Sequence, residues 1–281
     1  GRAEPARLTI LNGKKVKIIE SEANKYSINN FKQIDALKAK VNFAFLDSAT
    51  SIFHPSSTLS YNVETKNLKI TRENSNDAKI PFIAPFFKMI LYVDQFDWNI
   101  DSNYADMNST AVNAKLPTYF ESFEYYIPGI DTKYQQSIGM DPIGGLAAYC
   151  ESIGYHRVSI DEIARAWNKS GYKAIEQLVF KMMEEGYMYY DRETGMVDVY
   201  DKLFLHAKIR KDEENTNYDN IKLSSVTQGK VGKLLINQKK LEIFGAGDTK
   251  ISTKANITMN PSSDTIYISK NRGIVYKGRL A

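Results

Sequence analysis

The chain has 281 residues, of which 43% are hydrophobic and 12% aromatic, so it is long enough and apolar enough for one large domain or two to three ordinary ones. Its 37 basic and 33 acidic residues leave a net charge of +4, and this composition excludes an intrinsically disordered chain. The single cysteine excludes an intramolecular disulfide. No apolar run approaches the roughly 18 residues that a membrane-spanning helix needs.

The first region, residues 1–127, is predicted to be β-rich. Apolar residues alternate with polar or small ones in several short segments, which is typical of half-buried strands. Residues 59–63 lead through a polar turn at 64–67 to residues 68–70, and this pattern predicts a hairpin. Residues 96–101 show the same alternation, with Phe96 and Trp98 on one face.

The second region, residues 128–206, is predicted to be helical. Asp141 followed by Pro142 predicts a helix start, and Ser159 with Glu162 three residues later forms a capping box at another. A third helix is predicted to end at Gly186 and to be followed by a hairpin at 187–200. Apolar spacing places Trp167 in the core of these helices. The predicted core around Trp167 consists of Ile163, Leu178 and Met182.

The third region, residues 207–281, is again predicted to be β-rich, with a hairpin at 234–243. It holds 14 Lys and Arg against 7 Asp and Glu, whereas residues 150–206 hold 7 against 10. The predicted fold class is therefore α+β, in which two mainly antiparallel β-rich regions flank a small helical domain. The basic surplus lies outside that domain.

The helical region resembles a winged helix-turn-helix over about residues 141–203, because helix, helix, turn, helix and hairpin follow in that order. The chain also loosely resembles segments of very large, mostly unannotated β-rich envelope proteins of Gram-negative bacteria. That second resemblance rests on the helical region together with three stretches. They are VKIIESEANKYSINNF at 16–31, FDWNIDS at 96–102 and RGIVYKGRLA at 272–281. It implies an architecture and a cell-envelope location, and it implies no activity.

A winged helix raises the question of nucleic acid, which requires a basic recognition surface. The outward residues of the predicted third helix include two lysines but also three glutamates, so phosphates would be repelled. The sequence therefore predicts protein contact at this surface and makes nucleic acid an unfavoured partner. The candidate contact residues are Tyr172, Lys173, Glu176, Gln177, Lys181 and, in the hairpin, Arg192.

Asp97, Asn99 and Asp101 imitate the opening of a calcium-binding loop. The glycine that such a loop requires is replaced by Ser102, and Asn108 stands where a bidentate glutamate is needed. The simpler interpretation places the three side chains on the solvated face of a strand. No zinc, dinucleotide, phosphate-loop or nucleophile motif is recognisable, so no cofactor is expected.

These observations predict a non-enzymatic scaffold or protein-interaction segment of a larger, cell-envelope protein. Its partner would be another protein or the flanking regions of the same chain. Two alternatives stay open, a nucleic-acid-binding winged-helix protein and a hydrolase on a β-rich scaffold. If the chain is a piece of a longer β-structure, strands at 7–10 or 275–280 should lie at an unpaired sheet edge.

Overall fold

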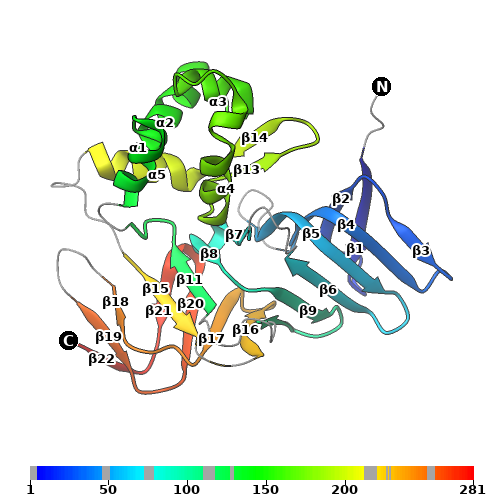
Figure 1. Ribbon diagram of the computed structural model, residues 1–281. Helices are drawn as coiled ribbons and strands as arrows, with labels where there is room; N and C mark the ends of the chain where they lie inside the picture. The colour runs from blue at the N-terminus through cyan, green and yellow to red at the C-terminus, as the bar shows by residue number, and fades with distance from the viewer. Residues whose placement is uncertain are drawn as a thin grey trace. The chain divides into compact units, whose positions relative to one another are not determined.

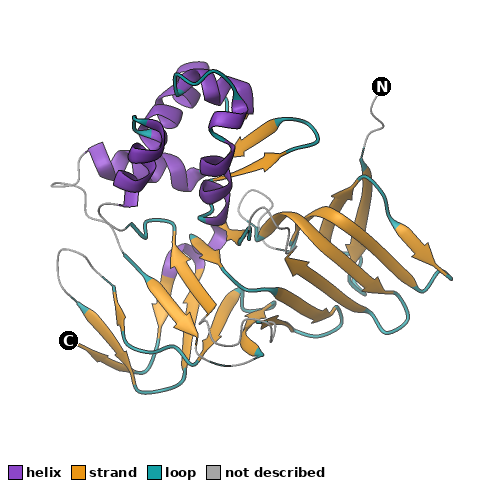
Figure 2. Cartoon of the chain, in the orientation of Figure 1, coloured by secondary structure: helices purple, strands orange, loops and turns teal. Residues whose placement is uncertain are grey.

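The computed structural model describes residues 5–45, 51–72, 79–109, 118–126, 130–211, 220–225, 227, 229–251 and 257–281. They form an α+β structure with five α-helices and a large antiparallel sheet (Figures 1 and 2). The chain divides into two compact units. The sheet unit comprises Gly1–Glu73, Pro81–Ser122 and Ile221–Ala281, and the helical unit comprises Asn74–Ile80 and Phe123–Asn220.

The sheet unit contains a 16-stranded sheet and a separate three-stranded sheet among its described residues. The strands before the helical unit are β1 (Ala6–Leu11), β2 (Lys17–Ala23), β3 (Ser27–Asn29), β4 (Gln33–Asn42), β5 (Phe53–Asn62), β6 (Asn67–Arg72), β7 (Phe82–Ala84), β8 (Met89–Leu91), β9 (Gln95–Asn99), β10 (Tyr104–Asn108) and β11 (Thr118–Ser122). Those after it are β15 (Lys222–Ser225), β16 (Lys230–Leu235), β17 (Lys240–Phe244), β18 (Thr249–Lys250), β19 (Thr258–Pro261), β20 (Thr265–Ser269), β21 (Gly273–Val275) and β22 (Gly278–Leu280).

The large sheet joins strands from both ends of the chain. β10 pairs with β16, and β11 pairs with β15, so parts that the sequence predicts as two separate β-rich regions share one sheet. The pairing spans more than a hundred residues and leaves no local pattern in the sequence, which explains the difference. The boundary predicted at residues 127 and 128 lies outside the described residues.

In most strands of the large sheet the pairing register gives one polar and one apolar face, because residues directly opposite each other on paired strands share a face. β7 and β8 are exceptions, since all their residues are buried. The apolar row crosses eight strands from β4 to β20. Its members are Ala36, Leu59, Ile70, Phe96, Met107, Gly232, Ile243 and Ile266. Gly232 is required there, because an added Cβ would lie 2.3 Å from the Glu242 carbonyl oxygen and 2.7 Å from the Met107 side chain.

Aromatic rings fill the centre of the sheet unit. Phe96 lies 5.0 Å from Phe43 and 4.9 Å from Phe82 between ring centroids, and the Trp98 ring stacks on Phe43 at 6.5 Å. All four side chains are buried. Tilted and offset contacts of this kind add to the free energy gained by burying their surface.

The first and last strands pair on one side only within the part of the chain that the structure describes. β1 pairs with β2, and β22 pairs with β19. Both strands therefore present a sheet edge, as the terminal segments predict. Two features of β1 disfavour pairing with a further strand at this edge. They are a register shift between Ile10 and Leu11 and the ion pair of Arg7 with Glu22.

The helical unit contains α1 (Ile130–Ile138), α2 (Pro142–Ile153), α3 (Ile160–Ala166), α4 (Glu176–Glu184) and α5 (Asp201–Lys211). A three-stranded sheet with β14 in the middle joins β12 (Arg157–Ser159), β13 (Met188–Asp191) and β14 (Met196–Val199). The predicted helix starts are confirmed. Asp141 accepts a hydrogen bond from the Gly144 amide, and Ser159 and Glu162 form the capping box.

Trp167 is fully buried in the core of the helical unit, as its spacing predicts. The same hydrophobic cluster contains Ile163, Leu178 and Met182. The indole Nε1 donates a hydrogen bond of 3.2 Å to the Pro142 carbonyl oxygen, which ties the end of α3 to the start of α2. Trp167 therefore contributes both buried apolar area and a satisfied polar contact.

We expect Trp167→Ala to lower the free energy of unfolding by about 3–5 kcal/mol, because it leaves a large cavity. Trp167→Phe, which loses the hydrogen bond but keeps most of the bulk, should cost less. Denaturant unfolding followed by far-ultraviolet circular dichroism measures both, with Tyr155→Ala as a control because Tyr155 is 70% exposed. Unchanged stability of Trp167→Ala would contradict this placement of the indole.

Candidate functional site

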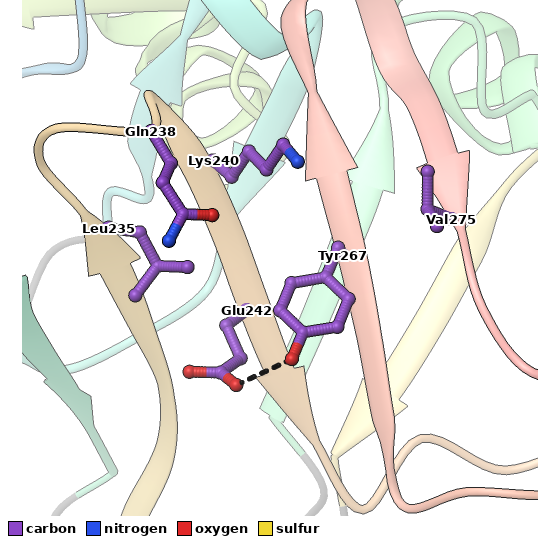
Figure 3. A pocket seen from close by; sticks show the side chains of 6 residues that line it. All are labelled: Leu235, Gln238, Lys240, Glu242, Tyr267 and Val275. Atoms are coloured by element: carbon purple, nitrogen blue, oxygen red, sulfur yellow. Dashed lines mark hydrogen bonds between the residues drawn. The ribbon is translucent and has the colours of Figure 1, made fainter.

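A hollow of about 440 Å³ lies on the polar face of the sheet unit (Figure 3). The register places Glu242 on β17 opposite Tyr267 on β20, and Tyr267 opposite Val275 on β21. The remaining lining residues come from the end of β16 and the turn into β17. They are Leu235, Gln238 and Lys240.

The side chains of the hollow form a polar, open surface. The Tyr267 hydroxyl donates a hydrogen bond of 3.1 Å to Glu242 Oε1, and this bond, with partial burial, raises the pKa of Tyr267. Lys240 has no ion-pair partner among the described residues. The hollow thus combines an ammonium, an amide and a carboxylate that tyrosine already engages, which suits binding of a small polar group.

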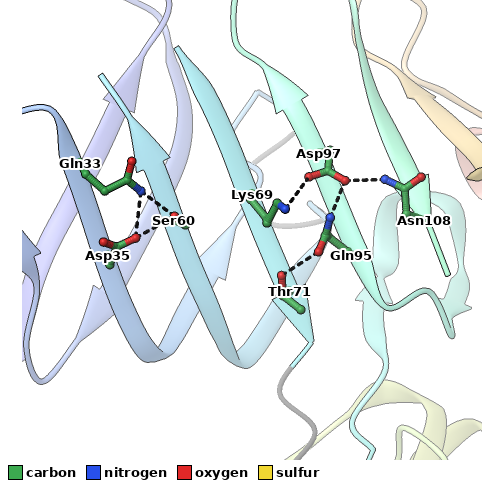
Figure 4. A network of polar contacts seen from close by, with 8 residues as sticks. All are labelled: Gln33, Asp35, Ser60, Lys69, Thr71, Gln95, Asp97 and Asn108. Atoms are coloured by element: carbon green, nitrogen blue, oxygen red, sulfur yellow. Dashed lines mark hydrogen bonds and ion pairs between the residues drawn. The ribbon is translucent and has the colours of Figure 1, made fainter. Parts of the chain in front are cut away.

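Further along the same face, polar side chains bind one another across strands β4 to β10 (Figure 4). Asp97 on β9 accepts hydrogen bonds from Gln95 and Asn108, and its Oδ1 lies 3.9 Å from Lys69 Nζ. A second group joins neighbouring strands through Gln33, Asp35 and Ser60. These groups compensate each other's charge and hydrogen-bonding capacity.

The three calcium candidates lie close in sequence but bind different protein groups. Asp97 belongs to the network above, and Asn99 Nδ2 donates to the Thr65 carbonyl oxygen at 2.9 Å. Asp101 pairs with Lys66 at 2.7 Å. Within the described ranges, no group of three or more His, Cys, Asp or Glu residues is arranged to hold a metal ion.

The predicted contact residues of the helical unit lie on one 3₁₀ turn, one helix and one hairpin. Tyr172 and Lys173 are in the turn that precedes α4, and Arg192 is in the turn between β13 and β14. The structure brings Arg192 to Glu176 at 3.3 Å, and its guanidinium carbon lies 4.5 Å from the centroid of the Phe180 ring. Gln177 and Lys181 are exposed on α4.

A buried histidine that the sequence does not single out lies in the helical unit. His206 on α5 is 1% exposed, and its Nε2 lies 2.8 Å from the Phe123 carbonyl oxygen. A carbonyl only accepts, so Nε2 carries the proton and Nδ1 accepts from the Tyr187 hydroxyl at 2.8 Å. Burial, with the nearby Lys202, lowers the pKa of His206 to about 3. The imidazole is therefore neutral and serves as a structural link.

Cys150 is buried on the apolar side of α2, and burial raises the pKa of its thiol. A buried thiol of raised pKa is a poor nucleophile. In the sheet unit Arg72 and Asp94 form a buried ion pair, at 8% and 11% side-chain exposure, which no local sequence pattern indicates.

Comparisons with models of known protein families, with curated proteins and with solved structures find no match for this chain. Among the described residues, no helix is long and apolar enough to cross a membrane.

We expect the helical unit to lose stability as the pH falls below about 6.5. In the unfolded state His206 is then protonated, whereas in the folded state, where its pKa is about 3, it stays neutral. Above the ordinary histidine pKa, His206 does not lower the free energy of unfolding. Near pH 3 the free energy of unfolding is lower by on the order of 4 kcal/mol.

His206→Gln tests this expectation, because a glutamine amide can donate to the Phe123 carbonyl and accept from Tyr187. Denaturant unfolding between about pH 3.5 and 7 should show a shallower pH dependence for the variant. His156→Gln, at an exposed histidine, is the control. This variant should show the same pH dependence of stability as the wild type. Equal slopes for wild type and His206→Gln would contradict the assignment.

Proposed function

We propose that this chain is a non-enzymatic scaffold or protein-interaction segment of a larger, cell-envelope protein. In this proposal α2 to β14 form a winged-helix-like module that contacts a protein through α4 and the β13–β14 hairpin. The resemblance to β-rich envelope proteins supports the location, and the electrostatics of α4 support the kind of partner.

The order of elements supports the winged-helix-like part of the proposal. α2 is followed by β12, α3, α4 and the hairpin β13–β14, and the small sheet has the order β12-β14-β13. In DNA-binding winged helices the helix before the hairpin enters the major groove. The equivalent element here is α4.

The observation that carries the proposed partner is the pairing of Arg192 with Glu176. Phosphate binding needs unpaired cations in a positive field. Here the hairpin arginine is engaged by a carboxylate and by the Phe180 ring, and α4 carries acidic residues at both ends. Such a surface combines charge of both signs with partly buried aromatic groups, which suits a protein partner.

The internally paired polar face of the sheet unit supports a scaffold role. Its Asp97 and Asp101 side chains bind neighbouring protein groups, and Glu242 binds Tyr267. Side chains committed to each other in this way hold strands in register rather than act on a substrate.

We expect the whole chain to bind duplex DNA no more tightly than micromolar at about 0.15 M salt, as an ordinary non-specific binder does. Fluorescence anisotropy with a labelled duplex measures the affinity. A sub-micromolar dissociation constant with a steep salt dependence would replace this proposal with the nucleic-acid-binding alternative.

Glu176→Gln should increase salt-dependent retention on heparin, because it releases Arg192 from its partner. Glu20→Gln makes the same charge change in the sheet unit, where Glu20 pairs with Lys17 at 2.7 Å, and is the matched control. Equal retention of the two variants would show that the Arg192–Glu176 pair does not limit the binding of anions.

A further inference from the structure

The hairpin of β3 and β4 carries a phenylalanine in a backbone conformation that bulky residues rarely adopt. Asn30 and Phe31 form its turn with φ values of 49° and 56°. Asparagine tolerates this left-handed region, whereas a bulky side chain there is a genuine outlier that glycine would relieve. The Lys32 amide donates a 2.9 Å hydrogen bond to the Asn29 carbonyl oxygen across this turn, and two-residue hairpin turns of this kind require positive φ at both central residues. The turn explains the backbone conformation, but glycine rather than phenylalanine is the usual residue at the second central position.

Packing within the chain does not explain why a phenylalanine stands at this position. Phe31 is 90% exposed, and Ile28 on β3 is 59% exposed. Val63 is 41% exposed and lies beside them, since its amide donates a 2.7 Å hydrogen bond to the Lys32 carbonyl oxygen. We call Ile28, Phe31 and Val63 the hairpin tip. These three side chains are exposed, and β3 lies at the outer end of the large sheet (Figure 1).

Two lysines and one glutamate lie close to the hairpin tip in the sequence or by contact with it. Residues 24–33 contain Lys25 and Lys32 and no acidic residue. The Lys32 ammonium lies 2.8 Å from Glu64, but both side chains are about 60% exposed, at 59% and 60%, so solvent screens this pair. Lys25 is exposed and has no ion-pair partner among the described residues. Lys25 and Lys32 against Glu64 leave one positive charge in excess, which favours an anionic surface.

The small apolar area of the hairpin tip favours a lipid surface over a protein as its binding partner. A stable protein interface buries about 800 Å² on each partner, over roughly 20–30 residues, and three side chains on a protruding turn fall far short of that. A lipid bilayer needs no matching pocket, and it accepts single aromatic side chains at the level of its head groups, with lysines beside anionic lipids.

We propose that the hairpin tip docks peripherally on an anionic phospholipid surface. Phe31 and Ile28 enter the head-group region, and Lys25 and Lys32 lie against the phosphates of anionic lipids. The docking is peripheral, and the inference is independent of the function proposed for the helical unit.

Co-sedimentation of the whole chain with vesicles tests the proposal. We expect binding to phosphatidylcholine vesicles that contain about 30% phosphatidylglycerol, and little binding to phosphatidylcholine alone or at high salt. Phe31→Gly should lower the partition coefficient at least about tenfold. Lys25→Gln should lower it roughly fivefold. Tyr155→Ser removes an aromatic side chain that is 70% exposed from the helical unit and should have no effect.

Stability measurements separate this role from a structural one. Phe31→Gly and Phe31→Asn should melt at or above the temperature of the wild type, since both residues tolerate positive φ. Vesicle binding that equals the wild type in both variants would overturn the proposal, as would equal binding to neutral vesicles. A concentration-dependent dimer in sedimentation velocity that Phe31→Gly abolishes would assign the tip to a second copy of the chain instead.

Discussion

The register of the large antiparallel sheet is the constraint on which the sheet unit depends. Since side chains alternate between the faces, a shift of one residue on any strand would exchange its polar and apolar sets. One continuous row carries Asp35, Ser60, Lys69, Asp97, Asp106, Lys233, Glu242 and Tyr267 across the polar face. The adjoining row on the other face is apolar and buried. Both the hollow and the network of Figure 4 follow from this one alignment.

The two units solve the problem of buried polar groups in different ways. The sheet unit buries an ion pair, Arg72 with Asp94, in which each charge offsets part of the desolvation cost of the other. The helical unit buries a neutral imidazole, which satisfies a carbonyl and a hydroxyl without carrying a charge. The second solution is sensitive to acid because protonation of His206 would place a charge beside Lys202.

The surfaces of the chain differ in how many of their side chains form ion pairs or hydrogen bonds within the chain. On the polar face of the sheet and at α4, charged groups bind each other, as Asp101 does with Lys66 and Glu176 with Arg192. At the hairpin tip a phenylalanine that is 90% exposed occupies a turn position with positive φ. The phenylalanine, where glycine is the usual residue, distinguishes the tip from the exposed turns at Lys66 and Lys239, which also have positive φ.

The sequence alone determined the local structure of this protein. Capping chemistry located the starts of α2 and α3 at Asp141 and Ser159, and helical spacing placed Trp167 in a core, because these signals act within a few residues. Alternation marked the strands and the α+β class. Only the tertiary structure decided that β10 meets β16 and that His206 lies between Phe123 and Tyr187. Such contacts join residues far apart in the chain, and their energies depend on burial and orientation that no local pattern encodes.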